Sequence, residues 1–323
     1  MRSESGIEPG GGLGKLQSVR GRGPIATFAA AAALCAGGAP AASAGTVGDL
    51  DIDYTATTTN WTEFPGRASQ ATYQPCSGAA SLAGSGAWIG ESVLSDPWES
   101  QFKLGKAYNV SIHPFELAPG APTPDSTRQV AETLFKQSHS LSLGESTVCA
   151  QSLAGLTYPT AKAKAPARSR KTAEVKCGGG GSVISGGGKV AGQFRGPRLV
   201  KSLPFDSGDA NAVPDDGWRI VVDNPSKKGR TITAYAICTT TTGFTYISEQ
   251  TNAPKRTRYH RQVGCPGGEY AIGGGVTHNI GFGDARLVAS RHVPFPQYDG
   301  WIAEVDNLSQ TKRKATTFTI CHT

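Results

Sequence analysis

The strongest constraint on the fold is a block of sequence that the chain contains twice. The segment DGWRIVVDN, residues 216–224, recurs as DGWIAEVDN, residues 299–307. Each copy continues without a gap to a cysteine, and each follows a Gly-rich stretch that also opens with a cysteine. Four blocks recur in one order, which indicates an internal structural repeat.

Cysteines mark the limits of these repeats. A third, divergent copy lies upstream: residues 76–86 keep the Cys and Gly spacing, but this copy has no Asp-Gly-Trp and no Asp-Asn. The chain has seven cysteines, and removal of an N-terminal leader that contains Cys35 would leave six. An even number of cysteines in an exported chain is typical of disulfides. Pairing the cysteine that opens each repeat with the one that closes it predicts Cys76–Cys149, Cys177–Cys238 and Cys265–Cys321. No C-x-x-C pair is present, so we expect no zinc site and no cofactor.

The repeated blocks have the pattern of β-strands. Alternation with period two, abundant Thr, Val and Ile, and frequent glycine predict an all-β fold of three Cys-bounded antiparallel units, sandwich- or prism-like. Gly186–Gly188 and Gly273–Gly275 predict a bulge or a close backbone crossing. The Asp-Asn pairs are expected to cap turns. Only Thr127–Gln137 shows a helical period.

The first 44 residues resemble a secretory leader. Basic residues precede the apolar run Ile25–Ala36, and an Ala-x-Ala site ends at Ala44, which predicts a signal peptide at 1–44 and a secreted protein. No later stretch is apolar enough for a transmembrane segment. The expected order is a divergent first repeat at 45–151, a flexible basic Pro/Ala-rich linker at 152–175, a second repeat at 176–240 and a third at 241–323.

Charge is distributed unevenly along the chain. Residues 45–151 contain 5 Lys/Arg against 11 Asp/Glu, whereas residues 152–323 contain 23 against 12. A basic surface attracts acidic polymers, so an anionic cell-wall polymer or glycan is the expected partner. No nucleic-acid-binding motif is present, and nucleic acid is not expected. The long first unit and the basic linker favour an independent first repeat with the second and third in contact, although three repeats closing into one body is the open alternative.

The pattern Cys-Pro-x-Gly…Gly-Gly-Gly…Asp-Gly-Trp…Cys resembles a class of secreted, high-GC bacterial proteins with Cys-bounded β repeats. Cys265, Gly273–Gly275, Trp301 and Cys321 carry the resemblance best, and the second repeat departs from it at Gly178. The resemblance implies export and a β-rich unit, and no activity. Through Cys-Pro-x-Gly near a strand, the chain is also similar to three-fold β-prism proteins of egg coats.

Candidate functional residues are few. No nucleophile elbow and no metalloprotease motif is present, so the leading hypothesis is a non-enzymatic protein, adhesive or structural at the cell envelope or on acidic glycans. The tentative binding residues are Trp88, Trp98, Trp218 and Trp301, although a Trp at a fixed repeat position is more typical of a core. The alternative is a secreted hydrolase in the first repeat, with Trp88, Trp98, Glu91, Glu99 and His113. A metal site formed by His278 and His292 is conceivable, but the expected role of both residues is that of surface or turn histidines.

Overall fold

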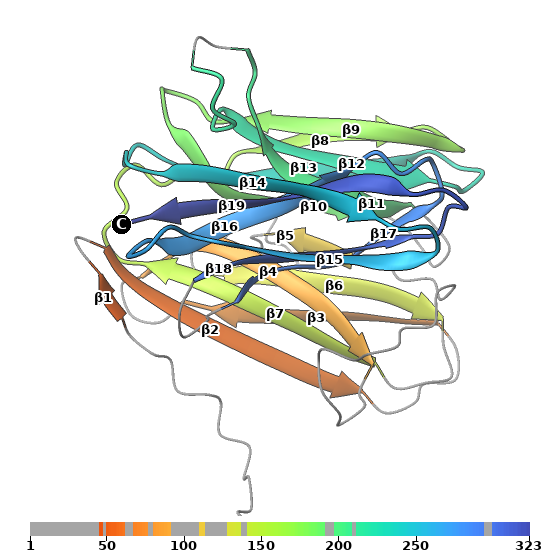
Figure 1. Cartoon of the computed structure of the whole chain (residues 1–323), viewed down its shortest axis with the longest axis horizontal. Coiled ribbons are helices and arrows are strands. Elements are labelled where there is room, and N and C mark those ends of the chain that lie inside the picture. The colour runs from red at the N-terminus through yellow and green to blue at the C-terminus, as the bar shows by residue number, and fades with distance from the viewer. Residues whose placement is uncertain are drawn as a thin grey trace, which may run out of the picture. The chain divides into compact units, whose positions relative to one another are not determined.

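A computed structural model describes residues 45–47, 50–61, 67–76, 80–91, 110–113, 128–136, 141–190, 197–208, 211–293 and 299–323. Every helix or strand that it defines among these residues is a β-strand (Figure 1), which confirms the all-β prediction. Residues 127–137, the one stretch with a helical period, contain strand β6, so the helix suggested by that period is wrong. The expected signal peptide lies outside the described residues and stays a prediction.

Each repeat consists of six strands in the same order. The first contains β2 (Leu50–Trp61), β3 (Arg67–Pro75), β4 (Ser81–Glu91), β5 (Val110–His113), β6 (Arg128–Lys136) and β7 (Leu141–Ala150), and β1 (Gly45–Val47) pairs with β2. The second contains β8 (Thr160–Ala165), β9 (Ser169–Lys176), β10 (Ser182–Val190), β11 (Arg198–Phe205), β12 (Gly217–Asn224) and β13 (Arg230–Thr239). The third contains β14 (Thr245–Ala253), β15 (Thr257–Gly264), β16 (Tyr270–His278), β17 (Ala285–Val293), β18 (Gly300–Asn307) and β19 (Arg313–His322).

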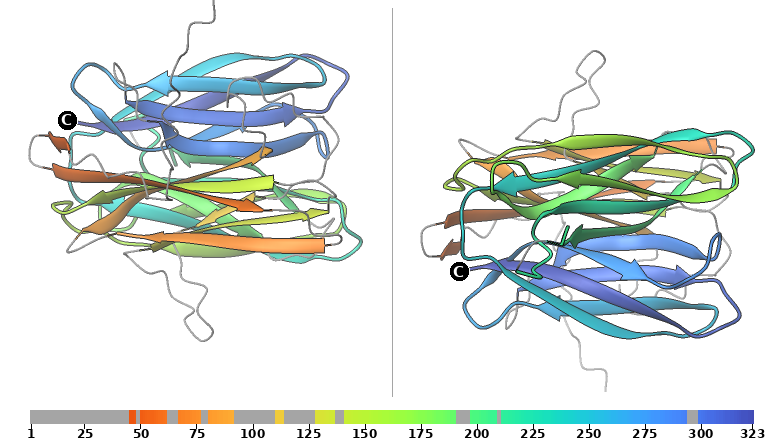
Figure 2. Two further views of the ribbon diagram at one scale, coloured as in Figure 1. Left: turned by 90° about the horizontal axis from the view of Figure 1, so that it is seen from below. Right: turned by 90° about the horizontal axis from the view of Figure 1, so that it is seen from above.

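The strands of each repeat are divided between two antiparallel sheets (Figure 2). Sheet A has the order β1-β2-β7-β4-β17-β18-β15, sheet B the order β3-β6-β5-β10-β13-β8, and sheet C the order β14-β19-β16-β11-β12-β9. The first, sixth and third strands of a repeat lie in one sheet, and its fourth, fifth and second strands lie in the next. Every sheet is therefore built from halves of two different repeats.

This division joins the three repeats in a cycle. Strand β4 pairs with β17, β16 pairs with β11, and β10 pairs with β5. The expectation of an independent first repeat is therefore wrong, because that repeat is hydrogen-bonded to both of the others. The physical reason is that each repeat alone leaves two open strand edges, which pair with the edges of its neighbours.

The expected linker is also ordered structure. Residues 160–165 and 169–176 form β8 and β9, which pair with β13 and β12. Lys162 and Lys164 face solvent, while the alternate residues Ala161, Ala163 and Ala165 pack in or against the core. The Pro/Ala/Lys composition suggested a flexible segment, but its period of two is that of an edge strand whose exposed lysines discourage pairing with other chains.

The predicted disulfides are all present. Cys76–Cys149, Cys177–Cys238 and Cys265–Cys321 are bonded, with Cα–Cα distances of 5.7, 5.7 and 5.8 Å. Each bridge joins the residue or loop before the third strand of a repeat to the sixth strand of the same repeat. The three-unit scheme with one internal bridge per unit is confirmed.

The tryptophan of the repeated block is a core residue. Trp218 and Trp301 are both 0% exposed. A Cβ atom added at Gly186 would lie 2.4 Å from Trp218 Cγ, and one added at Gly274 would lie 2.3 Å from Trp301 Cγ. The close approach expected of these glycines is confirmed, as is a register shift in both strands.

Candidate functional site

The Asn of each Asp-Asn pair joins two turns. Asn224 Nδ2 donates hydrogen bonds to the carbonyl oxygens of Ala165 and Pro166, in the β8–β9 turn, at 3.0 and 2.7 Å. It also donates to Lys228 O at 2.9 Å, in its own β12–β13 turn, and its Oδ1 accepts from Ser226. Asn224 is 0% exposed. One side chain therefore fixes both turns against each other.

The third repeat contains the same arrangement. Asn307 Nδ2 donates to Ala253 O, Pro254 O and Thr311 O at 3.0, 2.8 and 3.0 Å, and its Oδ1 accepts from Ser309. The prediction that the pairs cap turns is therefore confirmed for the asparagines. We call the two joined turns of a repeat its turn pair: residues 165–169 with 224–230 in the second repeat, and residues 253–257 with 307–313 in the third.

The aspartate of each Asp-Asn pair binds an arginine on a neighbouring strand and does not cap a turn. Asp223 receives a bidentate pair of hydrogen bonds from Arg170 on β9, at 2.6 and 2.9 Å, and Asp306 receives the same pair from Arg258 on β15, at 2.7 and 3.2 Å. The turn-cap interpretation was wrong for these carboxylates. They form cross-strand ion pairs, because the strand register places an Arg directly opposite each Asp.

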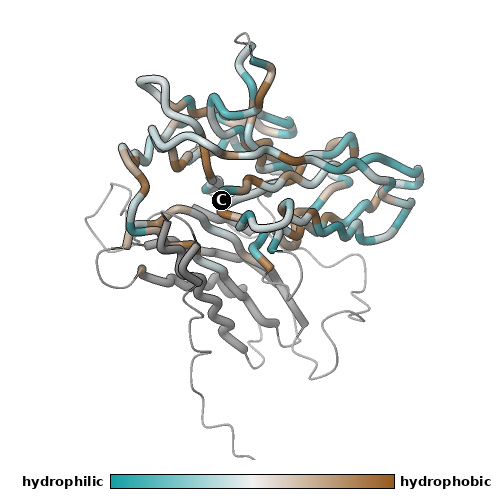
Figure 3. The backbone as a smooth tube through the Cα atoms, turned by 60° about the vertical axis from the view of Figure 1, so that its left-hand side comes forward, coloured by the Kyte–Doolittle hydropathy of each residue, from teal (hydrophilic) through white to brown (hydrophobic). Residues whose placement is uncertain are grey.

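The turn pairs are basic and contain no acid. In the second repeat their exposed cations are Arg168, Lys227 and Lys228, and in the third Lys255, Arg256 and Lys312. No Asp or Glu occurs in residues 165–169, 224–230, 253–257 or 307–313. Within the described part of the chain, no carboxylate forms an ion pair with any of these six side chains. Hydrophilic colour accordingly marks several strand turns in Figure 3.

One arginine in each turn pair has an unusual backbone. The φ angles are 52° for Arg168 and 51° for Arg256, in the left-handed region that favours glycine. Their backbone N–H groups donate to Ser226 O and Ser309 O, at 3.1 and 3.2 Å. A glycine would make the same backbone bond without the strain, which amounts to roughly 1–3 kcal/mol for such a residue. The bond therefore gives no reason for an arginine side chain at this position.

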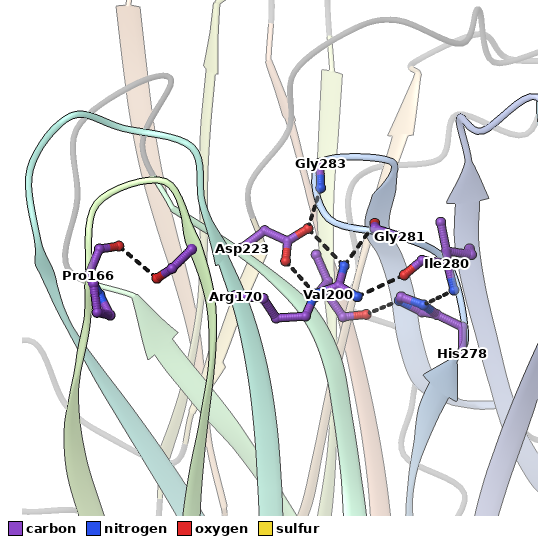
Figure 4. A network of polar contacts seen from close by, with 9 residues as sticks. Pro166, Arg170, Val200, Asp223, His278, Ile280, Gly281 and Gly283 are labelled. Atoms are coloured by element: carbon purple, nitrogen blue, oxygen red, sulfur yellow. Dashed lines mark hydrogen bonds and ion pairs between the residues drawn. The ribbon is translucent and has the colours of Figure 1, made fainter.

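A loop of the third repeat contacts residues beside the second repeat's turn pair (Figure 4) and also Leu308 in the third repeat's own turn pair. Arg170 Nη1 and Nη2 donate to Ile280 O and Gly281 O at 2.8 and 2.9 Å, and Gly283 N donates to Asp223 at 2.8 Å. At its other side, Leu308 N donates to Asp284 O at 2.8 Å. Residues 279–284, which we call the bridging loop, therefore contact both the second and the third repeat.

A neutral histidine supports the base of this loop. His278 Nε2 donates to Val200 O at 2.8 Å, and its Nδ1 accepts from Ile280 N at 3.1 Å. Burial, with the nearby charge of Lys201, lowers the pKa of His278 to about 3. The ring is buried, so the expectation of a surface or turn histidine was wrong, and both of its nitrogens are engaged.

His292 is likewise buried, and its Nε2 contacts the carboxylate of Asp299. The bridge from His292 to Asp299 spans the end of β17 and the start of β18. Among the residues that the structure describes, no group of three His, Cys, Asp or Glu side chains is placed to hold a metal ion.

The predicted binding residues do not come together. Trp218 and Trp301 are fully buried, and their Nε1 atoms donate to Ser202 Oγ and Ser290 Oγ at 2.9 Å in both cases. Their assignment as binding residues was wrong, because no part of either ring reaches the surface. Trp88 lies in β4 with its backbone paired to Ala289, and Trp98 lies outside the described residues.

The alternative hydrolase site is placed only in part. Glu91 ends strand β4 and His113 ends the short strand β5. Glu99 lies outside the described residues. The described backbone therefore gives this set no common site on which a reaction can be derived.

The sequence carries a signal for the basic turns that the repeat alignment missed. Pro-x-Arg occurs at Pro166–Arg168 and Pro254–Arg256, in the same turn of two repeats, and once more at Pro65–Arg67, between β2 and β3. The alignment started at the first cysteine of each repeat, which left out the two strands and the turn that precede it. Starting each repeat at its first strand brings the three motifs into register.

Comparisons with known proteins do not assign this chain to a family. Neither a scan against protein-family models nor a search of curated proteins found a match to this chain. Within the described residues, the structure contains no helix long and apolar enough to cross a membrane. The three disulfides fit an extracellular protein.

Proposed function

We propose that this protein is secreted and non-enzymatic, and that it adheres to anionic polymers of the cell envelope or to acidic glycans through the turn pairs of its second and third repeats. The observation that carries the proposal is the left-handed arginine at the same position in both turn pairs. Backbone strain that the fold does not require is found at sites of function. Exposed guanidinium groups without a carboxylate partner are suited to carboxylate, sulfate or phosphate groups.

The surrounding charges support the same ligand class. Each turn pair adds two exposed lysines beside its strained arginine: Lys227 and Lys228 in one, Lys255 and Lys312 in the other. The Asn224 and Asn307 contacts hold these turns in place before any ligand binds, which reduces the entropy lost on binding. Two similar basic sites on one chain favour a polymer with repeated negative charges, because the second contact is then intramolecular.

The test is binding of the purified protein to immobilised alginate, an acidic polysaccharide, in low salt. Arg168→Ala with Arg256→Ala is expected to weaken binding about thirtyfold, since each exposed cation near an anionic surface contributes about 1 kcal/mol and two are removed. Affinity is also expected to fall steadily as salt is raised, because bound counterions are released from the polymer.

A matched control removes two exposed lysines elsewhere. Lys162→Ala with Lys176→Ala lowers the net charge by the same amount, from the exposed positions of β8 and β9. This control is expected to change affinity less than twofold. Equal losses in the two double variants would mean that only net charge matters, and no binding by the unaltered protein would refute the proposal.

A further inference from the structure

The bridging loop exposes an aromatic ring. Phe282 is 44% exposed, and it is the exposed large hydrophobic residue of the part of the chain that the structure describes. A glycine flanks it on each side, and Gly283 has a φ of 81°, which an L-residue rarely adopts. A single exposed apolar side chain is common on a protein surface, so what indicates a contact is the place of this ring in a rigidly held loop beside exposed cations.

The loop that carries Phe282 is held on both sides. Arg170 and Asp223 of the second repeat bind its backbone at Ile280, Gly281 and Gly283. On the third repeat, Asn279 Oδ1 accepts from Lys314 N at 2.8 Å, and Asn279 N donates to Lys314 O at 3.0 Å. These bonds fix the backbone of the loop that carries Phe282, and those made by Arg170 and Asp223 are drawn in Figure 4.

The same contacts place the loop that carries Phe282 next to both turn pairs. Arg170, which binds the loop, follows the strained Arg168 by two residues. Lys314 and Leu308, which bind its other side, belong to or adjoin the β18–β19 turn of the third repeat. The residue with the exposed ring thus belongs to a loop whose backbone is bonded beside one group of exposed cations and within the turn pair that carries the other.

The exposed aromatic ring and the exposed cations of the turn pairs together favour one kind of anionic polymer over others. An aromatic ring offers an apolar face to the C–H groups of a sugar ring, and the cations on both sides match anionic substituents along a chain of such sugars. More than half of Phe282 is covered, so it presents part of its surface and does not project as an anchor for a lipid bilayer.

Resting on the proposed function, we propose that the ligand is an acidic polysaccharide and that Phe282 packs against one of its sugar rings between the two basic turn pairs. A polyanion without sugar rings binds the cations alone and gains nothing from Phe282.

The experiment measures the affinity of the purified protein for alginate, for linear polyphosphate and for phosphatidylglycerol vesicles in the same low-salt buffer. Phe282→Ala is expected to weaken alginate binding at least fivefold and to change polyphosphate binding less than twofold. Phe282→Trp, which keeps an aromatic face, is expected to retain alginate binding within twofold. The melting temperature of each variant, measured in parallel, is expected to change little, because nearly half of the Phe282 surface is exposed already.

Three outcomes would overturn the inference. Equal losses on both polymers would show a structural role for Phe282, and no loss on alginate would show that the ring is not a contact. A loss confined to anionic phosphatidylglycerol vesicles would assign it to a lipid surface instead. Failure of the unaltered protein to bind either polymer would overturn the proposed function itself, which is a different result from any of these three.

Discussion

At the scale of single residues, two buried asparagines organise the charged turns. Asn224 and Asn307 each accept from a nearby Ser and donate to three carbonyl oxygens in two different turns. Because the carbonyls lie up to 59 residues away in sequence, a local turn-cap argument accounts for only part of each network. The exposed arginines of the turns are held in position by contacts that these asparagines make.

His278 gives a prediction at this scale. Burial lowers its pKa from 6.5 to about 3 in the folded protein, so the unfolded chain binds more protons than the folded one between those values. Stability from this residue is complete above pH 6.5 and is lost as the pH falls toward 3. Between pH 7 and pH 5 the free energy of unfolding is expected to fall by about 2 kcal/mol from His278 alone.

Urea unfolding at the two pH values checks this expectation. His278→Gln removes the titrating group, so its pH-dependent loss is expected to be smaller by that amount than the loss of the unaltered protein. The same slope in both proteins would contradict the assignment of a buried, neutral His278.

Which residues form the site was predicted from the sequence only in part. The Asp-Asn pairs were recognised as structural, but the aspartates form ion pairs with Arg170 and Arg258, which lie 53 and 48 residues away. Nothing in the local sequence of Asp223 or Asp306 identifies those partners. The positive φ of Arg168 and Arg256 is equally invisible, since the left-handed position of a turn is normally recognised by a Gly or Asn.

At the scale of elements, one glycine of the third strand matches one tryptophan of the fifth. Gly186 faces Trp218 and Gly274 faces Trp301. In the first repeat, which has no Asp-Gly-Trp, the register places Ser85 at the position of these glycines. The repeat that lacks the Trp is therefore also the one that has a side chain where the other two have a glycine.

Gly274→Ala tests this pairing of elements. The new Cβ would lie 2.3 Å from Trp301 Cγ and 2.4 Å from the backbone oxygen of Phe318, so neither neighbour can yield easily. The free energy of unfolding is expected to fall by about 3 kcal/mol or more, measured by urea denaturation.

Gly267→Ala is the matched control, because no atom lies within 4 Å of its added Cβ. This variant is expected to unfold within about 0.5 kcal/mol of the unaltered protein. Similar losses for Gly267 and Gly274 would contradict the close packing of β16 against β18.

At the scale of the whole described unit, from Gly45 to Thr323, an edge strand of each repeat pairs with an edge strand of the next repeat, so that the three repeats form a closed cycle. Near the points of exchange, a Cβ at Gly84 would lie 1.8 Å from Ile272 O, and one at Gly273 would lie 2.0 Å from Ile184 O. The sequence predicted three Cys-bounded β units and their bridges, because cysteine spacing and strand period are local. The sequence did not decide whether the three repeats close into a cycle, because a pair such as β4 with β17 joins strands about 200 residues apart.

Limited proteolysis tests the cycle. A single cut after Arg168, in the exposed β8–β9 turn, leaves no disulfide across the nick. The two pieces are nevertheless expected to stay together, because β4–β17, β5–β10 and β8–β13 pairs join them. Size-exclusion chromatography in native buffer is expected to show one species that separates only in denaturant, whereas two independently eluting pieces would contradict the cycle.

The central claim is that the turn pairs bind an acidic polymer and that the strained arginines are retained for this contact. Replacing Arg168 and Arg256 together by glycine, with melting temperature and alginate affinity measured on the same sample, tests it most directly. Relief of the left-handed strain is expected to raise stability by about 1 kcal/mol per site, while the two lost guanidinium groups weaken binding about thirtyfold. A variant that is more stable and binds alginate as tightly as the unaltered protein would contradict the account.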